Sequence, residues 1–530
     1  MTMEASYLTV RRGPWSWLTT TDHKRIGVLY LAGILTFFLV GVTFGFLIRL
    51  HLLDPSAGLL PNETYNRILT LHGVVMIFLF IIPGIPSVFG NFFLPILIGA
   101  RDVAFPRLNL LSWYLYMAGG LLGVVSVAVG GPDTGWTFYV PYSFRTGANV
   151  TWPLTGAFLI GWSSILTGIN FVATVHRLRD PRMGWWQMPL FVWASYATAW
   201  VQIIATPVVG ILLLLVLAER FLGIGIFDPT RGGDPILYQH VFWIYSHPAV
   251  YIMVLPAMGV VSEVIATFAR RTIFGYRFIA MSSIAIAAIG SLVWGHHMFT
   301  SGMADEARIV FSFLTFLVAV PSAIKVFNWV ATLYRGSIEL SPALLLSLFF
   351  VALFAIGGLT GLMLASLSTD IHLHDTSFVV AHFHYTMFGG AGSVFFSACH
   401  YWFPKMFGRM YNRKVAYAAI ALFFVGFNLT YMSLMVAGAA GMPRRYADYL
   451  PEYAPYHHLS TYGSWILVAG VLTMIGNLVV SMVRGPKVPA NPYGGKTLEW
   501  SIPSPPPHEN FVGEPDLSHG PYEYPVEVER

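Results

Sequence analysis

Six histidines of this 530-residue chain lie within apolar stretches, where a polar side chain needs a specific partner. They are His72, His247, His296, His297, His382 and His384. Neutral imidazole is a common ligand of zinc, copper and haem iron. A single histidine of this kind could equally be a metal ligand or a hydrogen-bonded residue of the protein core. Six of them favour metal or haem binding.

His382 and His384 stand two residues apart in the segment F-V-V-A-H-F-H-Y-T-M. A helix turns by about 100° per residue, so their rings lie on nearly opposite faces. They therefore cannot bind one metal together, but they can bind two different groups on either side of the helix. His72, in another apolar stretch, could supply the second axial ligand of one haem. The alternative is a pair of unrelated core histidines.

His296 and His297 are adjacent in W-G-H-H-M-F-T, and they can converge on one ion only where a helix end distorts or a third ligand closes the site. His247 is the candidate third ligand. Three imidazoles with an open position suit copper or zinc, and an apolar cavity for a small gas substrate favours a redox metal. Tyr251 follows His247 by one helical turn, so its phenol lies on the same face. The alternative for Tyr251 is an ordinary interfacial aromatic residue.

The elements that position these residues are predicted to be membrane-spanning helices. The chain is 56% hydrophobic and only 10% charged, against about 25% charged in soluble domains, which excludes a soluble enzyme. One span needs about 20 apolar residues. The composition predicts an all-α, polytopic membrane bundle of about twelve transmembrane helices, with runs that begin near residues 26, 67, 107, 153, 190, 237, 275, 308, 341, 378, 414 and 461.

Three parts follow from this organisation: an N-terminal segment (1–25), the membrane domain (26–484) and a proline-rich tail (485–530), which is either disordered or extended across one face. Lys and Arg are more frequent in the loops on the side of the termini, which predicts cytoplasmic termini. Because the basic residues lie at helix ends, no nucleic-acid partner is indicated. The single cysteine, Cys399, excludes a disulfide framework and a cysteine-rich metal cluster.

Several segments resemble subunit I of the haem-copper terminal oxidases: Y-S-H-P-A-V-Y, W-G-H-H-M-F-T-S-G-M, H-D-T-S-F-V-V-A-H-F-H-Y, G-D-P-I-L-Y-Q-H and M-P-R-R-Y. The similarity runs in order from about Asp22 to the tail. It implies that the protein reduces O2 to water while protons are consumed and pumped. It also implies that His72 and His384 ligate a low-spin haem, that His382 ligates a high-spin haem, and that copper B is held by His247, His296 and His297. In the family, the tyrosine that matches Tyr251 is covalently joined to the histidine that matches His247.

The resemblance implies further binding residues on the side opposite the termini. Arg444 and Arg445 offer guanidinium forks, which suit the carboxylates of haem propionates, and Trp136 could donate its indole N–H there. Arg49 matches an arginine near the low-spin haem. His374 and Asp375 match a magnesium site that a residue of subunit II completes. We expect haem a and haem a3, although the sequence itself leaves types a, o and b open.

Lys325 is the only basic residue within a predicted span, a position that costs about 2.5–3.5 kcal/mol on insertion scales. It matches the lysine of the family's K-type proton path, with Ser322 one turn away and Tyr251 at the inner end of that path. The alternative is a lysine that reaches the membrane surface. Asp102 matches the start of a D-type path, and its alternative is a loop aspartate that balances Arg101. The other residues that match this path are Asn91, Asn109, Ser163, Ser164 and Asn170.

The chain departs from a common family pattern at Ala249, where many members have a glutamate that ends the D-type path. A branch without this glutamate has Tyr-Ser immediately before the histidine, as in Tyr245-Ser246-His247 here. Tyr245 precedes Ala249 by one helical turn on the same face. Our hypothesis is that Tyr245 and Ser246 replace the glutamate. The alternative is a tyrosine that only packs, in a path that ends in water.

Electrons must enter through a partner, because the copper A centre of the family needs cysteines that this chain lacks. We therefore expect subunit II, further oxidase subunits, cytochrome c as donor, O2 as substrate, and a lipid environment, the bacterial inner (plasma) membrane. A quinol oxidase is the alternative. Nitric oxide reductases resemble the chain less, because they lack the matching tyrosine and lysine. A secondary transporter is the alternative from another class, and it would contain no haem.

Overall fold

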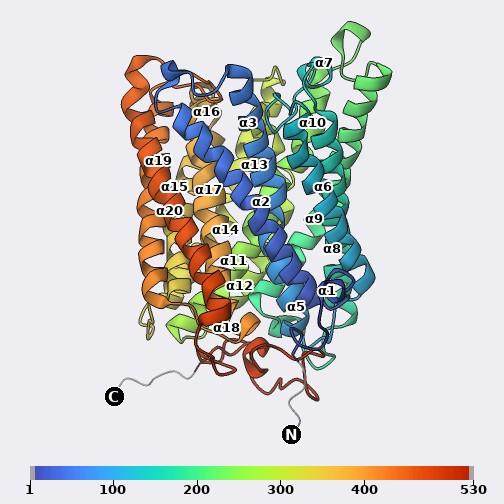
Figure 1. Cartoon of the computed structure of the whole chain (residues 1–530), viewed down its shortest axis with the longest axis vertical. Helices are drawn as coiled ribbons and strands as arrows, with labels where there is room; N and C mark the ends of the chain where they lie inside the picture. The colour runs from blue at the N-terminus through green and yellow to red at the C-terminus, as the bar shows by residue number, and fades with distance from the viewer. Residues whose placement is uncertain (1–5, 525–530) are drawn as a thin grey trace.

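The computed structural model describes residues 6–524, and within this range the regular structure is helical. The long helices run roughly parallel along the longest axis, and both ends of the chain lie at the same end of the bundle (Figure 1). Within the described range, eleven helical runs are long and apolar enough to cross a membrane. The predicted all-α, polytopic membrane class is confirmed.

The eleven runs, with the elements that form them, are α2 (His23–His51), α3 to α5 (Asn62–Leu97), α6 with η4 (Pro106–Val129), α8 (Thr151–Arg177), α9 (Leu190–Leu222), α10 with α11 (Pro235–Ala269), α12 with η7 (Tyr276–Met298), α13 with α14 (Asp305–Leu333), α15 (Pro342–Ala365), α19 (Arg413–Ala439) and η9 with α20 (Pro451–Arg484).

The remaining predicted run is one continuous helical segment formed by α17 (Ser377–Thr386), η8 (Met387–Gly392) and α18 (Ser393–Phe407). It is not among the eleven, because its histidines, glycines and serines make it less apolar than the others. It carries two of the six candidate histidines. With this segment the structure accounts for the predicted twelve runs.

Small residues bring the helices into backbone contact, which is how membrane helices commonly associate. A Cβ atom added to Gly119 of α6 would lie 2.5 Å from the carbonyl oxygen of Gly156 of α8, and the reverse distance is equally short. Gly426 of α19 is equally close to Leu467 of α20. These contacts set the distances between the helices and hence the geometry at their centre.

Two π-helical turns lie close to candidate haem ligands. The segment η2 (Val75–Ile81) begins three residues after His72, and η8 (Met387–Gly392) begins three residues after His384. A π-helical turn contains an extra residue, and such turns are frequent at functional sites. Each therefore changes the face that the rest of its helix presents after the ligand.

The tail folds over the end of the bundle at which the chain begins (Figure 1). Its described part is held by buried polar contacts: Lys405 Nζ donates to the carbonyl of Ile502 at 2.6 Å, and Tyr522 donates to Glu263 at 2.6 Å. Of the two expectations for the tail, the structure shows an extended segment laid across this face. Residues 1–5 and 525–530 of the predicted terminal segments lie outside the described residues.

Candidate metal and cofactor site

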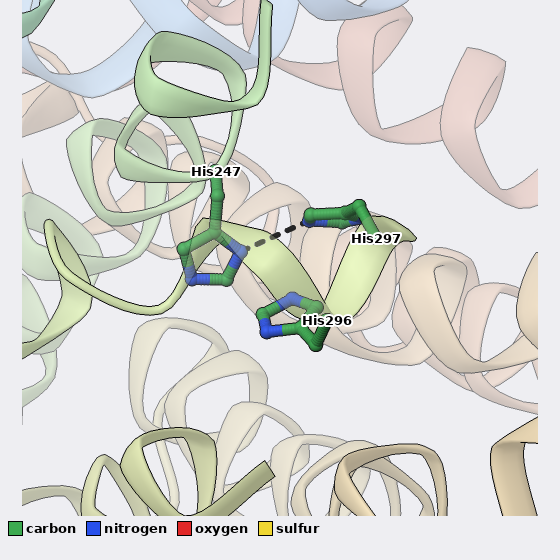
Figure 2. A group of neighbouring side chains, drawn as sticks. All are labelled: His247, His296 and His297. Atoms are coloured by element: carbon green, nitrogen blue, oxygen red, sulfur yellow. Dashed lines mark hydrogen bonds between the residues drawn. The ribbon is translucent and has the colours of Figure 1, made fainter. Parts of the chain in front are cut away.

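Three histidines form a cluster where two helical runs are interrupted. His247 occupies the junction of α10 (Pro235–Ser246) and α11 (Pro248–Ala269), and the other two lie in the short 3-10 helix η7 (Trp294–Met298). One ligand nitrogen from each ring lies within 4.8 Å of the others. Figure 2 shows the three rings gathered around one space. The distorted helix end is what allows the adjacent His296 and His297 to converge.

Neighbouring groups orient these rings. His296 Nδ1 lies 3.0 Å from the hydroxyl of Thr315, and the ring of His297 stacks on Trp243 at 3.6 Å between centroids. The hydroxyl of Tyr251 lies 2.8 Å from His247 Nε2. Three nitrogen donors at these separations suit one copper or zinc ion with a further position free for substrate.

The other three candidate histidines each have Nδ1 held by the protein. Nδ1 of His72 lies 2.9 Å from the carbonyl oxygen of Gly41, and that of His384 lies 2.8 Å from the carbonyl oxygen of Val380. His382 Nδ1 lies 3.0 Å from the hydroxyl of Thr360. These contacts fix each ring and leave its Nε2 for another partner, which is the usual arrangement of histidines that ligate metals.

One cavity of about 810 Å³ joins both sets of histidines. It falls within the usual size range of ligand sites. Two glycines leave room beside the histidine rings. A Cβ atom added to Gly45 would lie 3.0 Å from His72 Cε1, and one added to Gly361 would lie 3.1 Å from His382 Cε1. The predicted residues on its wall are His72, His247, His296, His297, His382, His384, Tyr251, Tyr245, Ser246, Ser322, Arg49, Trp136, Arg444, Arg445, His374 and Asp375.

Cationic side chains lie on the wall of this cavity at the ends of the helices. Burial lowers the pKa of Arg444 to about 10, so it remains a cation at neutral pH. The Nε atoms of Arg49 and Arg444 are buried without a protein acceptor among the described residues. Arg445 lies beside Gly135, the neighbour of Trp136. This orphaned, cationic donor set suits carboxylate groups of a large cofactor.

The candidate magnesium ligands lie on the same wall. The side chain of Asp375 is 71% exposed and lies 3.8 Å from Arg444, whereas His374 Nδ1 lies 2.9 Å from the buried Asp370. Burial lowers the pKa of His374, but its hydrogen bond to Asp370 and the charges of Asp370 and Asp375 together outweigh this and leave the pKa above its ordinary value. Asp370 is absent from the sequence-based prediction, although its i, i+4 spacing to His374 is a usable signal.

Lys325 of α14 (Ala319–Leu333) is 1% exposed and donates to Ser283 Oγ at 2.7 Å and to the Ile279 carbonyl at 3.0 Å. These contacts with α12 (Tyr276–Gly290) exclude the alternative of a lysine that reaches the membrane surface. Ser322, one turn before Lys325, lines the cavity together with Tyr251. Ser283 is a residue that the sequence reasoning missed.

Asp102 lies in the loop between α5 (Asn91–Leu97) and α6 (Pro106–Val125), and burial raises its pKa to about 7. Asn170 of α8 holds this loop, because its Oδ1 accepts the amide of Phe105 at 2.9 Å. Asn91 Oδ1, both side-chain polar atoms of Asn109 and Ser164 Oγ are buried without a protein partner among the described residues. Buried polar atoms of this kind are commonly satisfied by ordered water.

The structure adds residues to this polar set that the sequence reasoning missed. The hydroxyl of Tyr30 lies 2.9 Å from Ser112 Oγ and 3.1 Å from Ser163 Oγ. On α9, which packs between α8 and α11, Ser195, Gln202 and Thr206 have buried polar atoms without a described protein partner. Their spacing along one helical face of an apolar run is a signal that could have found them.

Tyr245 and Ser246 end α10 at the cavity wall. Tyr245 is 3% exposed, and Ser246 Oγ is buried without a described protein partner. Both hydroxyl-bearing residues therefore line the cavity, on a helix that packs against α9.

Residues 25–466 match the family model described as cytochrome C and quinol oxidase polypeptide I. A Synechocystis protein named cytochrome c oxidase subunit 1 is 45% identical over 100% of this chain and 97% of its own length. Proteins of the same name from Thermostichus vulcanus and Bacillus subtilis are 42% and 39% identical, covering 97% and 94% of this chain and 94% and 80% of their own lengths.

The solved structure of a haem-copper terminal oxidase dimer matches with a TM-score of 0.75 at 22% identity, over 87% of this chain and 85% of that one, which shows a shared fold.

The chain therefore belongs to the family of cytochrome c and quinol oxidase polypeptide I, the subunit I of haem-copper oxidases. This confirms the predicted class of membrane oxidoreductase, of the cytochrome c oxidase type, and its role as the catalytic oxidase subunit. Membership in the family implies haem and copper B, which the histidine cluster fits.

Proposed function

We propose that this protein reduces O2 to water with electrons that cytochrome c delivers through the copper A centre of subunit II, and that it couples this reaction to proton pumping. The observation that carries the proposal is one cavity that joins three clustered histidines to three others whose Nδ1 atoms are already held. This donor set supports a low-spin haem on His72 and His384, a high-spin haem on His382, and copper B on His247, His296 and His297.

When bound, the iron of the high-spin haem would supply two electrons for O2 reduction and copper B one, and a redox-active phenol is suited to supply the fourth together with its proton. Tyr251 is that phenol, because its hydroxyl lies beside His247 at 2.8 Å. Arg444, Arg445 and Trp136 hold the haem propionates, and Arg49 lies near the low-spin haem. His374 and Asp375, with Asp370 behind them, hold magnesium together with a residue of subunit II.

Two polar routes lead from the side of the termini toward the cavity. Along the K-type route, Ser283, Lys325 and Ser322 move protons toward Tyr251. The D-type route begins at Asp102 and continues past Asn91, Asn109 and Asn170 to Ser163 and Ser164. Tyr245 and Ser246 end this route in place of a carboxylate. Because the unperturbed pKa of a phenol is near 10, Tyr245 relays a proton with water and does not store one as a charge.

The relatives support a bacterial plasma membrane, with the termini on the cytoplasmic side, lipid around the helices, and further oxidase subunits in the complex. We propose haem a and haem a3 as the cofactors. A quinol oxidase is the alternative to a cytochrome c oxidase, since the family model covers both donors.

The test is to purify the complete oxidase and record its absorbance spectrum, its pyridine haemochrome and its copper-to-iron ratio. O2 consumption is then compared with reduced cytochrome c and with a quinol as donor. We expect two spectrally distinct haems, bound copper and turnover on cytochrome c. A protein without haem would contradict the oxidase proposal, and turnover on quinol alone would correct the donor.

A further inference from the structure

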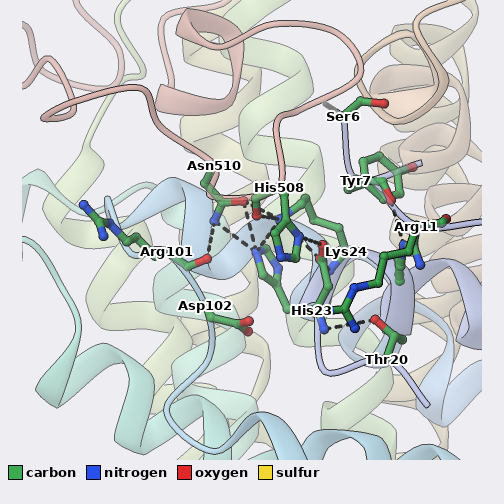
Figure 3. Close-up of polar contacts among 12 residues, drawn as sticks. Ser6, Tyr7, Arg11, Thr20, His23, Lys24, Arg101, Asp102, His508 and Asn510 are labelled. Atoms are coloured by element: carbon green, nitrogen blue, oxygen red, sulfur yellow. Dashed lines mark hydrogen bonds and ion pairs between the residues drawn. The ribbon is translucent and has the colours of Figure 1, made fainter. Parts of the chain in front are cut away.

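The two ends of the proposed D-type route differ in how their polar groups are paired. At the outer end, the side-chain amide of Asn510 donates to the carbonyls of Ala100 at 2.9 Å and Arg101 at 3.0 Å. Its Oδ1 accepts Lys24 Nζ at 2.7 Å. Figure 3 shows these groups beside Asp102. Deeper in the bundle, where α8 packs against α9, several polar side chains have no hydrogen-bond partner among the described residues.

Two glycines of α8 bring α9 close on either side of Ser164. Gly161, Ser164 and Gly168 follow one another at i, i+3 and i+7, so they share one face of the helix. A Cβ atom added to Gly161 would lie 3.5 Å from Thr206 Cγ2, and one added to Gly168 would lie 3.1 Å from Gln202 Cβ. Ser164 therefore lies on α8 between the points where this helix meets Gln202 and Thr206 of α9.

Each of these three side chains carries a buried polar atom without a partner in the part of the chain that the structure describes: Ser164 Oγ, Gln202 Oε1 and Thr206 Oγ1. Gln202 is 2% exposed, and Thr206 is fully buried. Thr198, on the same helix, bonds instead to the carbonyl of Ala194 one turn earlier, at 2.8 Å. Thr206 does not make this bond, so its hydroxyl is left for another partner.

A proline adds a backbone acceptor at the same level of α9. Pro207 lies inside the helix, and because proline has no N–H, the carbonyl of Ile203 lacks its usual helical donor. Ile203 also lies at the contact with α8, since a Cβ atom added to Gly168 would lie 3.1 Å from its Cγ1. Within a membrane, a carbonyl freed in this way is satisfied by neighbouring helices, hydroxyl side chains or ordered water. Donors and acceptors suited to water thus lie along one short stretch of this contact.

We propose that Ser164, Gln202 and Thr206 bind a small cluster of water where α8 meets α9, and that this water carries the protons of the D-type route from α8 to α9. From α9 the protons pass to α10, which packs against it and ends in Tyr245 and Ser246. This inference rests on the proposed function, which places Ser164 in that route. It gives the polar face of α9 a part in the reaction.

Each proton transfer leaves the cluster uncharged. A water molecule or hydroxyl that accepts a proton from the side of Asp102 releases another toward α10, so Ser164 and Thr206 end each transfer neutral. The side-chain amide of Gln202 exchanges no proton and orients the water. Because Ala249 offers no carboxylate at the inner end of the route, water held in place is what carries the proton there.

The test uses the complete oxidase in vesicles and the double variant Gln202→Leu with Thr206→Val, which removes the polar atoms at nearly the same side-chain size. A pH-indicator dye measures proton uptake during oxidation of the reduced enzyme, and infrared difference spectra in ordinary and ¹⁸O-labelled water measure the bound water. We expect the double variant to slow proton uptake about tenfold, since the water loses its hydrogen-bonding partners. It should also lose O–H bands that shift in labelled water.

The matched control is Thr198→Val, because the hydroxyl of Thr198 is already paired within its own helix. It should keep the proton uptake and the water bands of the wild type. Thr206→Ser should keep both as well, since it retains the hydroxyl. If the double variant does not assemble with both haems, the isosteric single variant Thr206→Val tests the same point.

The outcomes separate this inference from the proposed function. If Asp102→Asn leaves proton uptake unchanged, the D-type route itself is wrong. If Asp102→Asn slows uptake but the double variant takes up protons as fast as Thr198→Val, the route stands and the water site on α9 is overturned. Slow uptake with unchanged water bands also overturns it, because the effect is then one of packing only. Slow uptake with loss of the bands supports it.

Discussion

Two buried polar regions of this protein differ in how completely their polar atoms are paired. Around the cavity, His72, His382 and His384 each have one ring nitrogen held and the other without a hydrogen-bond partner among the described residues. Beneath the tail, polar side chains bond mainly to other parts of the chain: Tyr522 donates to Glu263, and Trp402 donates to Glu499. The ring nitrogens left without a partner face the cavity, whereas beneath the tail most polar atoms are paired, with Glu499 Oε2 as an exception.

Two buried lysines show the same difference. Lys405 donates to three carbonyls of the tail, those of Ile502, Ala490 and Pro503, at 2.6, 2.9 and 3.4 Å. Lys325 has two acceptors, Ser283 and Ile279. An ammonium group has three donors, so Lys405 is fully paired, while Lys325 keeps one donor without an acceptor in the described part of the chain. Burial alone therefore does not distinguish the two lysines, whereas the number of acceptors does.

The largest effect is expected at the cavity. His296→Ala should abolish O2 reduction while both haems stay bound, because the proposed haem ligands lie on other helices. Copper per iron and the haem spectrum measure retention of each group, and O2 consumption measures activity. The control is His458→Ala, since His458 is exposed. Wild-type O2 consumption in the copper-free His296→Ala enzyme would contradict the assignment.

Lys325→Met should slow turnover by about a hundredfold, because proton delivery to the reduced site is lost. Anaerobic reduction of the high-spin haem, followed by stopped-flow absorbance, measures the affected step. An unchanged rate of that reduction would remove Lys325 from the K-type route.

Tyr245→Phe combined with Ser246→Ala should lower the number of protons ejected per electron, with a smaller effect on turnover. Both hydroxyls lie at the cavity wall, and Ser246 Oγ has no described protein partner. Pumping in reconstituted vesicles is the measurement. If pumping and turnover both remain at wild-type values, neither residue belongs to the mechanism.

Lys405→Met should leave the haem spectrum and turnover nearly unchanged and destabilise the protein by about 2–4 kcal/mol, because buried carbonyls of the tail lose their donor. Thermal unfolding of the purified complex is the measurement, with Lys414→Met on the exposed start of α19 as control. A loss of turnover without a loss of stability would show that Lys405 does not belong to the purely structural region.

The sequence predicted the helices well, because each apolar run has a length set by the membrane thickness. It also named residues that the structure places on the cavity wall, among them His247, His296 and His297, whose convergence it expected at a distorted helix end or through a third ligand. It missed Asp370, Ser283, Tyr30 and the polar face of α9. Ser283 and Tyr30 contact residues of other helices, and the spacing along one helix does not reveal which helices pack together. Asp370 and the polar face of α9 do have a signal in their spacing, which the sequence reasoning did not use.

The fold of the tail was the least predictable part. Its prolines exclude a long helix but fit both a disordered segment and an extended one. The outcome depends on buried partners such as Lys405 and Glu263, which lie far from the tail in the sequence. The sequence alone can show that Lys405 and Glu263 carry charged side chains that are costly to bury. It does not show that their partners lie in the C-terminal tail.

The π-helical turns that follow His72 and His384 have a consequence for how this protein can vary. Each turn inserts a residue into its helix, so the part that carries the ligand and the part beyond it are packed in independent registers. A deletion of one residue within η2 or η8 would convert that turn to α-helix with both parts still in place, whereas a deletion in the regular α-helix on either side would rotate one part relative to the other by about 100°. Near His72 and His384, the effect of an insertion or deletion therefore depends on whether the rest of the helix keeps its rotation about the helix axis. Length changes there are not restricted to loops.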